Sequence, residues 1–173
     1  MPSLEDLVEE MAGLRARLEA AEGVLAIHAL KARYGELVDR RFEKGRPLEG
    51  SRLDDLAKAI ADLFTPDGIW DGGPALGVAV GRAAIADRMR RTTLAFSRHL
   101  FLQPRITVTG DTAEARWELL SPCTTAGGKA CWMSGFEDDE YVRDPQGYWL
   151  HHRMRLTTVF MAPAGEGWGP IHW

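Results

Sequence analysis

The sequence is poor in cysteine and has no long apolar run. Its only two cysteines, Cys123 and Cys131, are eight positions apart and form no C-x-x-C motif. A turn-like Ala-Gly-Gly segment at 126–128 lies between them, so a cross-strand disulfide is one alternative. We favour reduced, partly buried thiols, as in most cytoplasmic proteins. No stretch approaches the roughly 18 uninterrupted apolar residues that a membrane-spanning helix requires.

An excess of positive charge is also missing. The 21 Lys and Arg residues are intermixed with 25 Asp and Glu residues, which gives a net charge of −4. No strongly basic face is expected, so nucleic acid is disfavoured as a partner. The first six residues, MPSLED, are acidic where a signal peptide needs a basic segment. We predict a cytoplasmic protein that binds neither nucleic acid nor membranes.

Several motifs of cofactor and metal enzymes are absent as well. The glycines between 72 and 81 lack a P-loop lysine and the G-x-G-x-x-G spacing, and no G-x-S-x-G elbow occurs. His151 and His152 are adjacent in an expected strand, so they point to opposite faces and do not easily chelate one metal. Nothing beside Cys123 marks it as an activated nucleophile. The sequence therefore predicts no cofactor and no metal site.

Two helical patterns occupy the first forty residues. From 4 to 25, apolar residues recur at alternating spacings of three and four, which is typical of a short coiled-coil seam. Ser3 and Asp6 form a capping box at its start. Gly23 weakens this helix, and a second apolar pattern follows and ends at Asp39. The first seam must be buried, and we expect a neighbouring subunit to cover it. Its residues are Leu4, Leu7, Met11, Leu14, Leu18, Ala21 and Leu25.

The remaining chain changes from helical to strand patterns. A loop at 44–51 precedes a helix that Ser51 can cap and that the turn at 65–68 ends. A short strand begins at 69, and a third helix is expected from 81 to about 96. Four strands follow, at 105–108, 112–121, 129–142 and 148–160, and then a loop-like tail. This order predicts an α+β fold in one domain, residues 1–173, with a curved antiparallel sheet closed by three to four helices around a conical cavity.

Three polar residues lie among apolar runs in this pattern: Tyr34, Asp39 and His99. Asp39 directly follows Leu37 and Val38, where the helix dipole disfavours an acid. His99 stands between two apolar segments, and its imidazole can accept and donate a proton near neutral pH. A solvent-exposed Asp39 and a satisfied core His99 are the structural alternatives. The pattern alone does not bring the two residues together.

Five segments, in this order, are similar to the SnoaL-like, nuclear-transport-factor-2-like superfamily. They are AIHALKARYGELVDR (26–40), LFTPDGIWDGG (63–73), GRAAI (81–85), RHLFLQPRITVTGDTAEARWELL (98–120) and GYWLHHRMRL (147–156). Among its members the sequence resembles bile-acid 7α-dehydratase, scytalone dehydratase and hexachlorocyclohexane dehydrochlorinase. The resemblance implies an active site of Tyr34, Asp39 and His99. It also implies a homo-oligomer, a trimer in preference to a dimer.

Four positions around this site differ from the residues of these relatives. Ser121 stands where the bile-acid enzyme has a further Asp, and Cys123 where scytalone dehydratase has a second catalytic His. Gly72 replaces a cavity tyrosine, and Thr158 replaces an arginine on the last strand. The resemblance therefore implies the proton-transfer core but a different set of substrate contacts, so the substrate itself is not transferred.

These observations together predict a cofactor-independent lyase. His99, oriented by Asp39, acts as the base, and Tyr34 donates a hydrogen bond to the leaving or developing oxyanion. The substrate is a hydrophobic cyclic or aromatic small molecule, and the reaction is dehydration, a related elimination or a retro-aldol deformylation. An isomerase, a cyclase or a non-catalytic binding module of the same fold is the alternative. The expected substrate contacts are Trp70, Trp117, Leu119, Ser121, Cys123, Met154, Leu156, Thr158 and Phe160.

Overall fold

The computed structural model describes residues 2–165, and a long helix dominates its first part. Helix α1 (Leu4–Asp39) begins at Ser3, whose side chain accepts from the Asp6 amide while the Asp6 carboxylate accepts from the Ser3 amide. The predicted interruption at Gly23 is wrong, because the helix continues through it. A Cβ there would lie 3.2 Å from Val108 and 3.4 Å from Trp149. The glycine lets the helix pass close to the sheet.

Short elements connect this helix to the sheet. They are β1 (Phe42–Glu43), β2 (Arg46–Pro47), α2 (Ser51–Ala61), β3 (Phe64–Asp71), α3 (Gly73–Leu76), β4 (Val78–Val80), α4 (Gly81–Met89) and β5 (Leu94–Ser97). The helix from Ser51 is confirmed, although Gly50 rather than Ser51 holds the cap position. Two predictions are wrong. Residues 65–68 lie inside β3, where the register shifts, and the third helix ends at Met89, so that residues 94–97 pair with β7 instead.

Four long strands form most of the sheet: β6 (Leu100–Thr109), β7 (Thr112–Thr125), β8 (Ala130–Arg143) and β9 (Trp149–Pro163). The strand order is β4-β3-β9-β8-β7-β5, and β6 also pairs with β7. The expectation of a wholly antiparallel sheet is wrong, because β3 runs parallel to β9. Alternate residues of β7 from Ala113 to Ser121 are buried, so one face of this strand points into the core.

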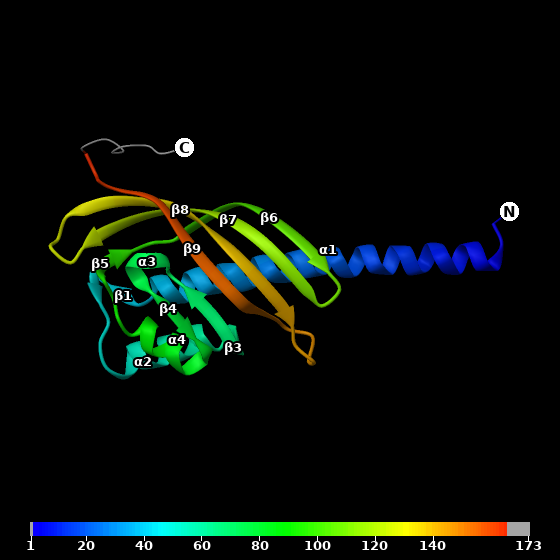
Figure 1. Cartoon of the computed structure of the whole chain (residues 1–173), viewed down its shortest axis with the longest axis horizontal. Helices are drawn as coiled ribbons and strands as arrows, with labels where there is room; N and C mark the ends of the chain where they lie inside the picture. Colours follow the sequence, from blue (N-terminus) through cyan, green and yellow to red (C-terminus); the bar gives the residue numbers. More distant parts are fainter. Residues whose placement is uncertain (1, 166–173) are drawn as a thin grey trace.

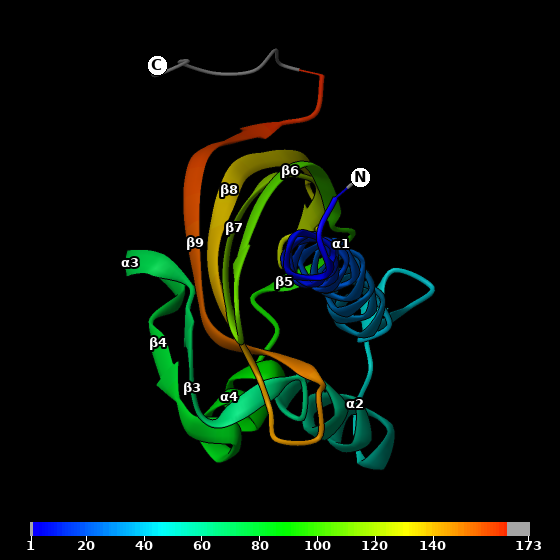
Figure 2. The same ribbon diagram turned by 90° about the vertical axis from the view of Figure 1, so that its right-hand side faces the viewer.

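The strands curl around the second half of α1, while α2 and α4 lie at one end of the sheet (Figures 1 and 2). One core cluster packs residues of α1, α2, α4, β3 and β9, including Tyr34, Phe64 and Ile85. A second gathers Ile27 of α1 against Trp117, Tyr141 and Trp149 of the sheet. This α+β arrangement leaves the end of α1 at the wall of a cavity. Within residues 2–165, no helix combines the length and apolarity needed to cross a bilayer.

Candidate active site

Asp39 and His99 meet although sixty positions separate them in the chain. Asp39 is the last residue of α1, and His99 lies between β5 and β6. One carboxylate oxygen, Oδ1 of Asp39, accepts hydrogen bonds from the His99 backbone N–H at 3.0 Å and from the ring Nδ1 at 2.8 Å. An ionised carboxylate has only acceptors, so Nδ1 carries the hydrogen, and in the neutral imidazole Nε2 is the nitrogen with the lone pair. The contact fixes both the tautomer and the orientation of the ring.

The imidazole of His99 lies at the wall of a cavity of about 90 Å³. Its walls come from the end of α1, from β3, α4 and β5, and from the inner faces of β7, β8 and β9. Two of the lining residues, Arg91 and Thr93, are exposed. Its lining includes Tyr34, Val38, Arg41, Trp70, Leu76, Arg88, Met89, Leu94, His99, Leu119, Met133, Glu137 and Leu156.

Tyr34 presents a protonated hydroxyl to the same cavity. Its oxygen accepts a hydrogen bond from Trp70 Nε1 at 3.1 Å, and within residues 2–165 it makes no other. Burial, followed by the negative charge of Glu137, raises the pKa of Tyr34 well above its usual value. The phenol therefore stays protonated across the physiological range. Its hydrogen is available to an oxygen atom of a bound molecule.

A buried charged network lies behind this wall. The Lys31 ammonium pairs with Glu137 and, at 2.7 Å, with Asp139. The Tyr141 hydroxyl donates to Asp139 at 2.7 Å and accepts from Trp117 Nε1 at 3.0 Å. Burial lowers the pKa of Lys31, but the attraction of the two carboxylates is larger, and the pKa of Lys31 is raised overall. Of this network, Glu137 alone lines the cavity.

Of the nine predicted substrate contacts, three line the cavity and six do not. Trp70, Leu119 and Leu156 line the cavity together with Tyr34 and His99. Asp39 is outside this lining and, together with His99, lines a second hollow of about 600 Å³ between α1, β5 and β6. The other six predicted contacts are also outside the lining of the first cavity. Trp117 and Met154 belong to the two cores, Ser121 and Cys123 are buried between strands, Thr158 is exposed, and Phe160 is half-buried near the end of β9.

The two cysteines face each other on paired strands. Cys123 lies directly opposite Cys131, and their buried sulfur atoms are 3.1 Å apart as free thiols. Burial, followed by a hydrogen bond with Cys131, raises the pKa of the Cys123 thiol to about 12. A thiol of this kind is a poor nucleophile, and Cys123 does not line the cavity.

Sequence reasoning missed the charged residues at or behind the cavity, among them Lys31, Arg41, Arg88 and Glu137. Each resembles a solvent-exposed charge on an amphipathic element when it is considered alone. For Glu137, the pairing of β8 with β7 would have indicated burial. Glu137 lies opposite Trp117, and Trp117 belongs to the buried face of β7. Within residues 2–165, no three His, Cys, Asp or Glu side chains gather as metal ligands.

A family model described as a SnoaL-like domain matches residues 19–155. The chain belongs to the SnoaL-like family. The match covers the curled sheet except the end of β9, the helices of the body and both members of the Asp39–His99 pair. It leaves out the first part of α1. A search of curated proteins gave no match.

Solved structures share this SnoaL-like fold at low sequence identity. Hexachlorocyclohexane dehydrochlorinase of type 3 from Novosphingobium barchaimii is 18% identical with a TM-score of 0.70, covering 89% of this chain and 99% of its own. A Novosphingobium aromaticivorans protein provisionally named scytalone dehydratase is 19% identical with a TM-score of 0.65, covering 87% and 97%. An NTF2-like protein from Novosphingobium aromaticivorans is 26% identical with a TM-score of 0.58, covering 96% and 94%. Dehydratase-type and dehydrochlorinase proteins are thus among the structural neighbours.

Proposed function

We propose that this SnoaL-like protein is a cofactor-independent lyase in which Asp39 and His99 perform general acid–base chemistry. The observation that carries the proposal is the pair of hydrogen bonds from His99 to one oxygen of Asp39, at the wall of a cavity. With Nδ1 held, Nε2 is positioned to remove a proton from a bound molecule. Asp39 stabilises the imidazolium that forms, and His99 can return the proton to a departing group.

The other groups of the cavity support an elimination. Tyr34 can donate its hydrogen to a leaving hydroxyl or a developing oxyanion, since Trp70 already occupies the acceptor side of its oxygen. Trp70, Leu119 and Leu156 supply apolar walls for a ring. The cavity is smaller than the roughly 150 Å³ that holds benzene in a dry protein interior. A cyclic or aromatic substrate therefore places only its reacting end in this cavity, and the remainder lies outside it.

The experiment is a screen of cyclic and aromatic alcohols and halides, followed by mass spectrometry for loss of water or of hydrogen halide. His99→Ala should lose turnover by about 10²–10⁴-fold, the usual contribution of a positioned base. His152→Ala is the matched control, because His152 lies outside the cavity and contacts Thr65. Equal turnover by wild type and His99→Ala would contradict the proposal. Ligand binding without turnover in either protein would favour a binding module.

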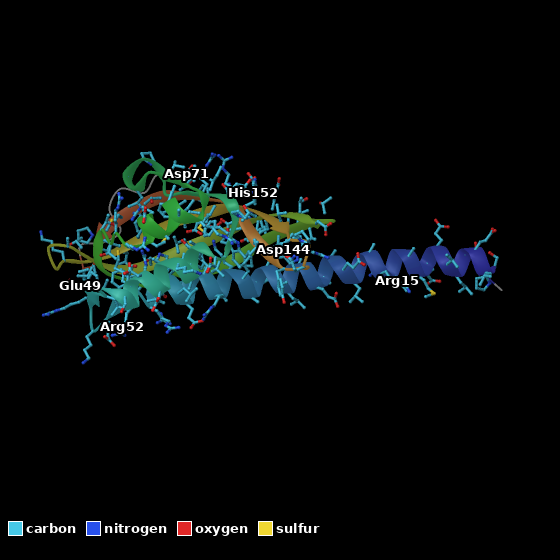
Figure 3. All side chains as sticks on the ribbon, turned by 90° about the horizontal axis from the view of Figure 1, so that it is seen from below. Arg15, Glu49, Arg52, Asp71, Asp144 and His152 are labelled. Carbon is cyan, nitrogen blue, oxygen red and sulfur yellow. The ribbon has the colours of Figure 1, made fainter. Side chains whose placement is uncertain are left out.

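We also propose that the protein is a homo-oligomer, a trimer before a dimer, held in part by the first half of α1. This part projects from the body, and around Arg15 no other element accompanies it (Figures 1 and 3). The apolar seam is exposed there, from 43% at Leu7 to 79% at Leu4. A seam with coiled-coil spacing is buried most simply by the same seam of a second copy.

A further inference from the structure

Two arginines at the cavity wall have no carboxylate partner. Arg41 follows α1 and is only 9% exposed, and Arg88 is a half-buried residue of α4. Within residues 2–165, neither guanidinium forms an ion pair with Asp or Glu. The neighbouring Arg90, which lies outside the cavity lining, pairs with both Asp54 and Asp87. The exposed Arg90 thus has counter-charges, while Arg41 and Arg88, the two less exposed of the three arginines that line the cavity, have none.

Backbone carbonyls account for part of their hydrogen bonding. Arg41 donates from Nε to Val38 O at 3.1 Å and from Nη1 to Met89 O at 3.0 Å, at the C-terminal ends of α1 and α4. Arg88 donates from Nε to Leu76 O at 3.3 Å and from Nη1 to Arg91 O at 2.7 Å. Holding helix ends explains these bonds. It leaves Nη2 of each guanidinium without a hydrogen bond in the described chain.

The electrostatic surroundings of this pair are unfavourable for a cation. Burial, and the charge of Arg88, lower the pKa of Arg41, while Tyr34 and Asp39 oppose the shift. Burial is also the main cause that lowers the pKa of Arg88. The Asp39 carboxylate is engaged by His99, and Glu137 is neutralised by Lys31. Buried cations are normally compensated by an anion, because desolvation is costly otherwise.

We propose that Arg41 and Arg88 bind a carboxylate group of the substrate. Each arginine has one terminal nitrogen, Nη2, left to donate, so the two guanidinium groups together can hydrogen-bond the two oxygens of one carboxylate. Arg88 lies over the ring of Trp70 at 5.0 Å, and Trp70 donates to Tyr34. The anion site therefore adjoins the groups of the proposed acid–base site. This inference rests on the proposed function, and it narrows the substrate to a cyclic or aromatic carboxylic acid.

A carboxylate at this position also suits the chemistry. A carboxylate on the substrate opposes removal of a proton from a neighbouring carbon, because a second negative charge develops on that carbon in the transition state. Two guanidinium groups neutralise that charge before the proton is transferred to His99. The reacting end of the molecule then lies against Trp70, Leu119 and Leu156.

The test is calorimetric binding of benzoate and of benzamide, its neutral counterpart of similar shape, at neutral pH and fixed ionic strength. Wild type should bind benzoate about tenfold tighter than benzamide or better. Arg88→Gln should lose about tenfold in benzoate affinity and keep its benzamide affinity. Arg90→Gln removes the same charge outside the cavity and should bind benzoate as wild type does. Arg41→Lys keeps the charge but cannot hold Val38 O and Met89 O while also donating from a free terminal nitrogen, so it should weaken benzoate binding as well.

Equal affinities of wild type and Arg88→Gln for benzoate would overturn the inference, and so would equal affinities of wild type for the two probes. His99→Ala separates this result from the proposed function. It should bind benzoate normally while turnover is lost. If His99→Ala keeps full turnover and Arg88→Gln still loses benzoate, the acid–base proposal fails and the anion site stands.

Discussion

At the scale of single residues, the buried network around Asp139 links charge to stability. Asp139 lies fully buried and accepts from Lys31 and from Tyr141. Burial is the main cause that raises its pKa to about 6, with Glu137 adding to the shift and Lys31 opposing it. An aspartate in an unfolded chain ionises near pH ~4. Between roughly pH 4 and 6, the folded protein therefore holds a proton at Asp139 that the unfolded chain has lost.

The sign of the pH effect follows from this proton. Because the folded state binds more protons, the contribution of Asp139 to stability is complete below about pH 4 and declines as the pH rises through about 6. The amide introduced by Asp139→Asn does not titrate, so wild type should lose stability relative to this variant from roughly pH 4 to 7. Urea unfolding at several pH values measures the difference. Asp138→Asn is the control, since Asp138 lies on the outer face beside Arg116. Parallel curves for wild type and Asp139→Asn would refute the assignment.

The residue scale also shows how far the candidate site can be predicted from sequence. Tyr34, Asp39 and His99 were identified because ordered segments resemble a family, whereas their own local patterns fit ordinary surface or core positions equally well. Glu137 and Asp139 belong to an acidic run, EDDE, that resembles a solvated surface. Only the pairing of β8 with β7 shows that alternate members of this run face inward. Whether such a charged residue faces solvent or the interior depends on contacts between segments that are distant in the sequence.

At the scale of elements, α1 is the clearest difference between local pattern and structure. Glycine at position 23 weakens a helix, but the sheet approaches α1 so closely there that a side chain would crowd Val108 and Trp149. Tertiary packing therefore keeps the glycine inside a continuous helix. The strands β7, β8 and β9 were predicted well, since alternation over many residues is a strong signal, whereas the prediction for β6 (105–108) covers less than half of Leu100–Thr109. The ends of α4 and β5 were not, because Leu94 and Phe96 fit a helix as well as a strand.

Leucine substitutions at two glycines of α1 test this account. Gly23→Leu overpacks the contact with β6 and β9 and should destabilise the protein by about 1–3 kcal/mol. Gly13→Leu adds a side chain where nothing lies within 4 Å, and it should be neutral or stabilise the helix by about 0.5–1 kcal/mol. Urea unfolding midpoints measure both. A Gly23→Leu variant as stable as Gly13→Leu would show that the close approach is not required.

At the scale of the whole molecule, the projecting half of α1 has to be explained. A helix with an apolar stripe of this length rarely remains exposed to water, and the body of this chain covers only its second half. Light scattering after size exclusion should give an oligomer for the full chain and a smaller mass after deletion of residues 2–22. Leu14→Glu should also reduce the mass, whereas Arg15→Glu, one position off the seam, should not. An unchanged mass after the deletion would exclude the seam as an interface.

The central claim is that Asp39 and His99 act as one unit, and a double-mutant cycle tests it most directly. Turnover of the substrate found in the screen is measured for wild type, Asp39→Asn, His99→Ala and the double variant, with folding checked by circular dichroism. If Asp39 acts only through His99, the double variant should be no slower than His99→Ala alone, and both should lose about 10²–10⁴-fold in kcat. Full activity in either single variant, or losses that multiply in the double variant, would contradict the account.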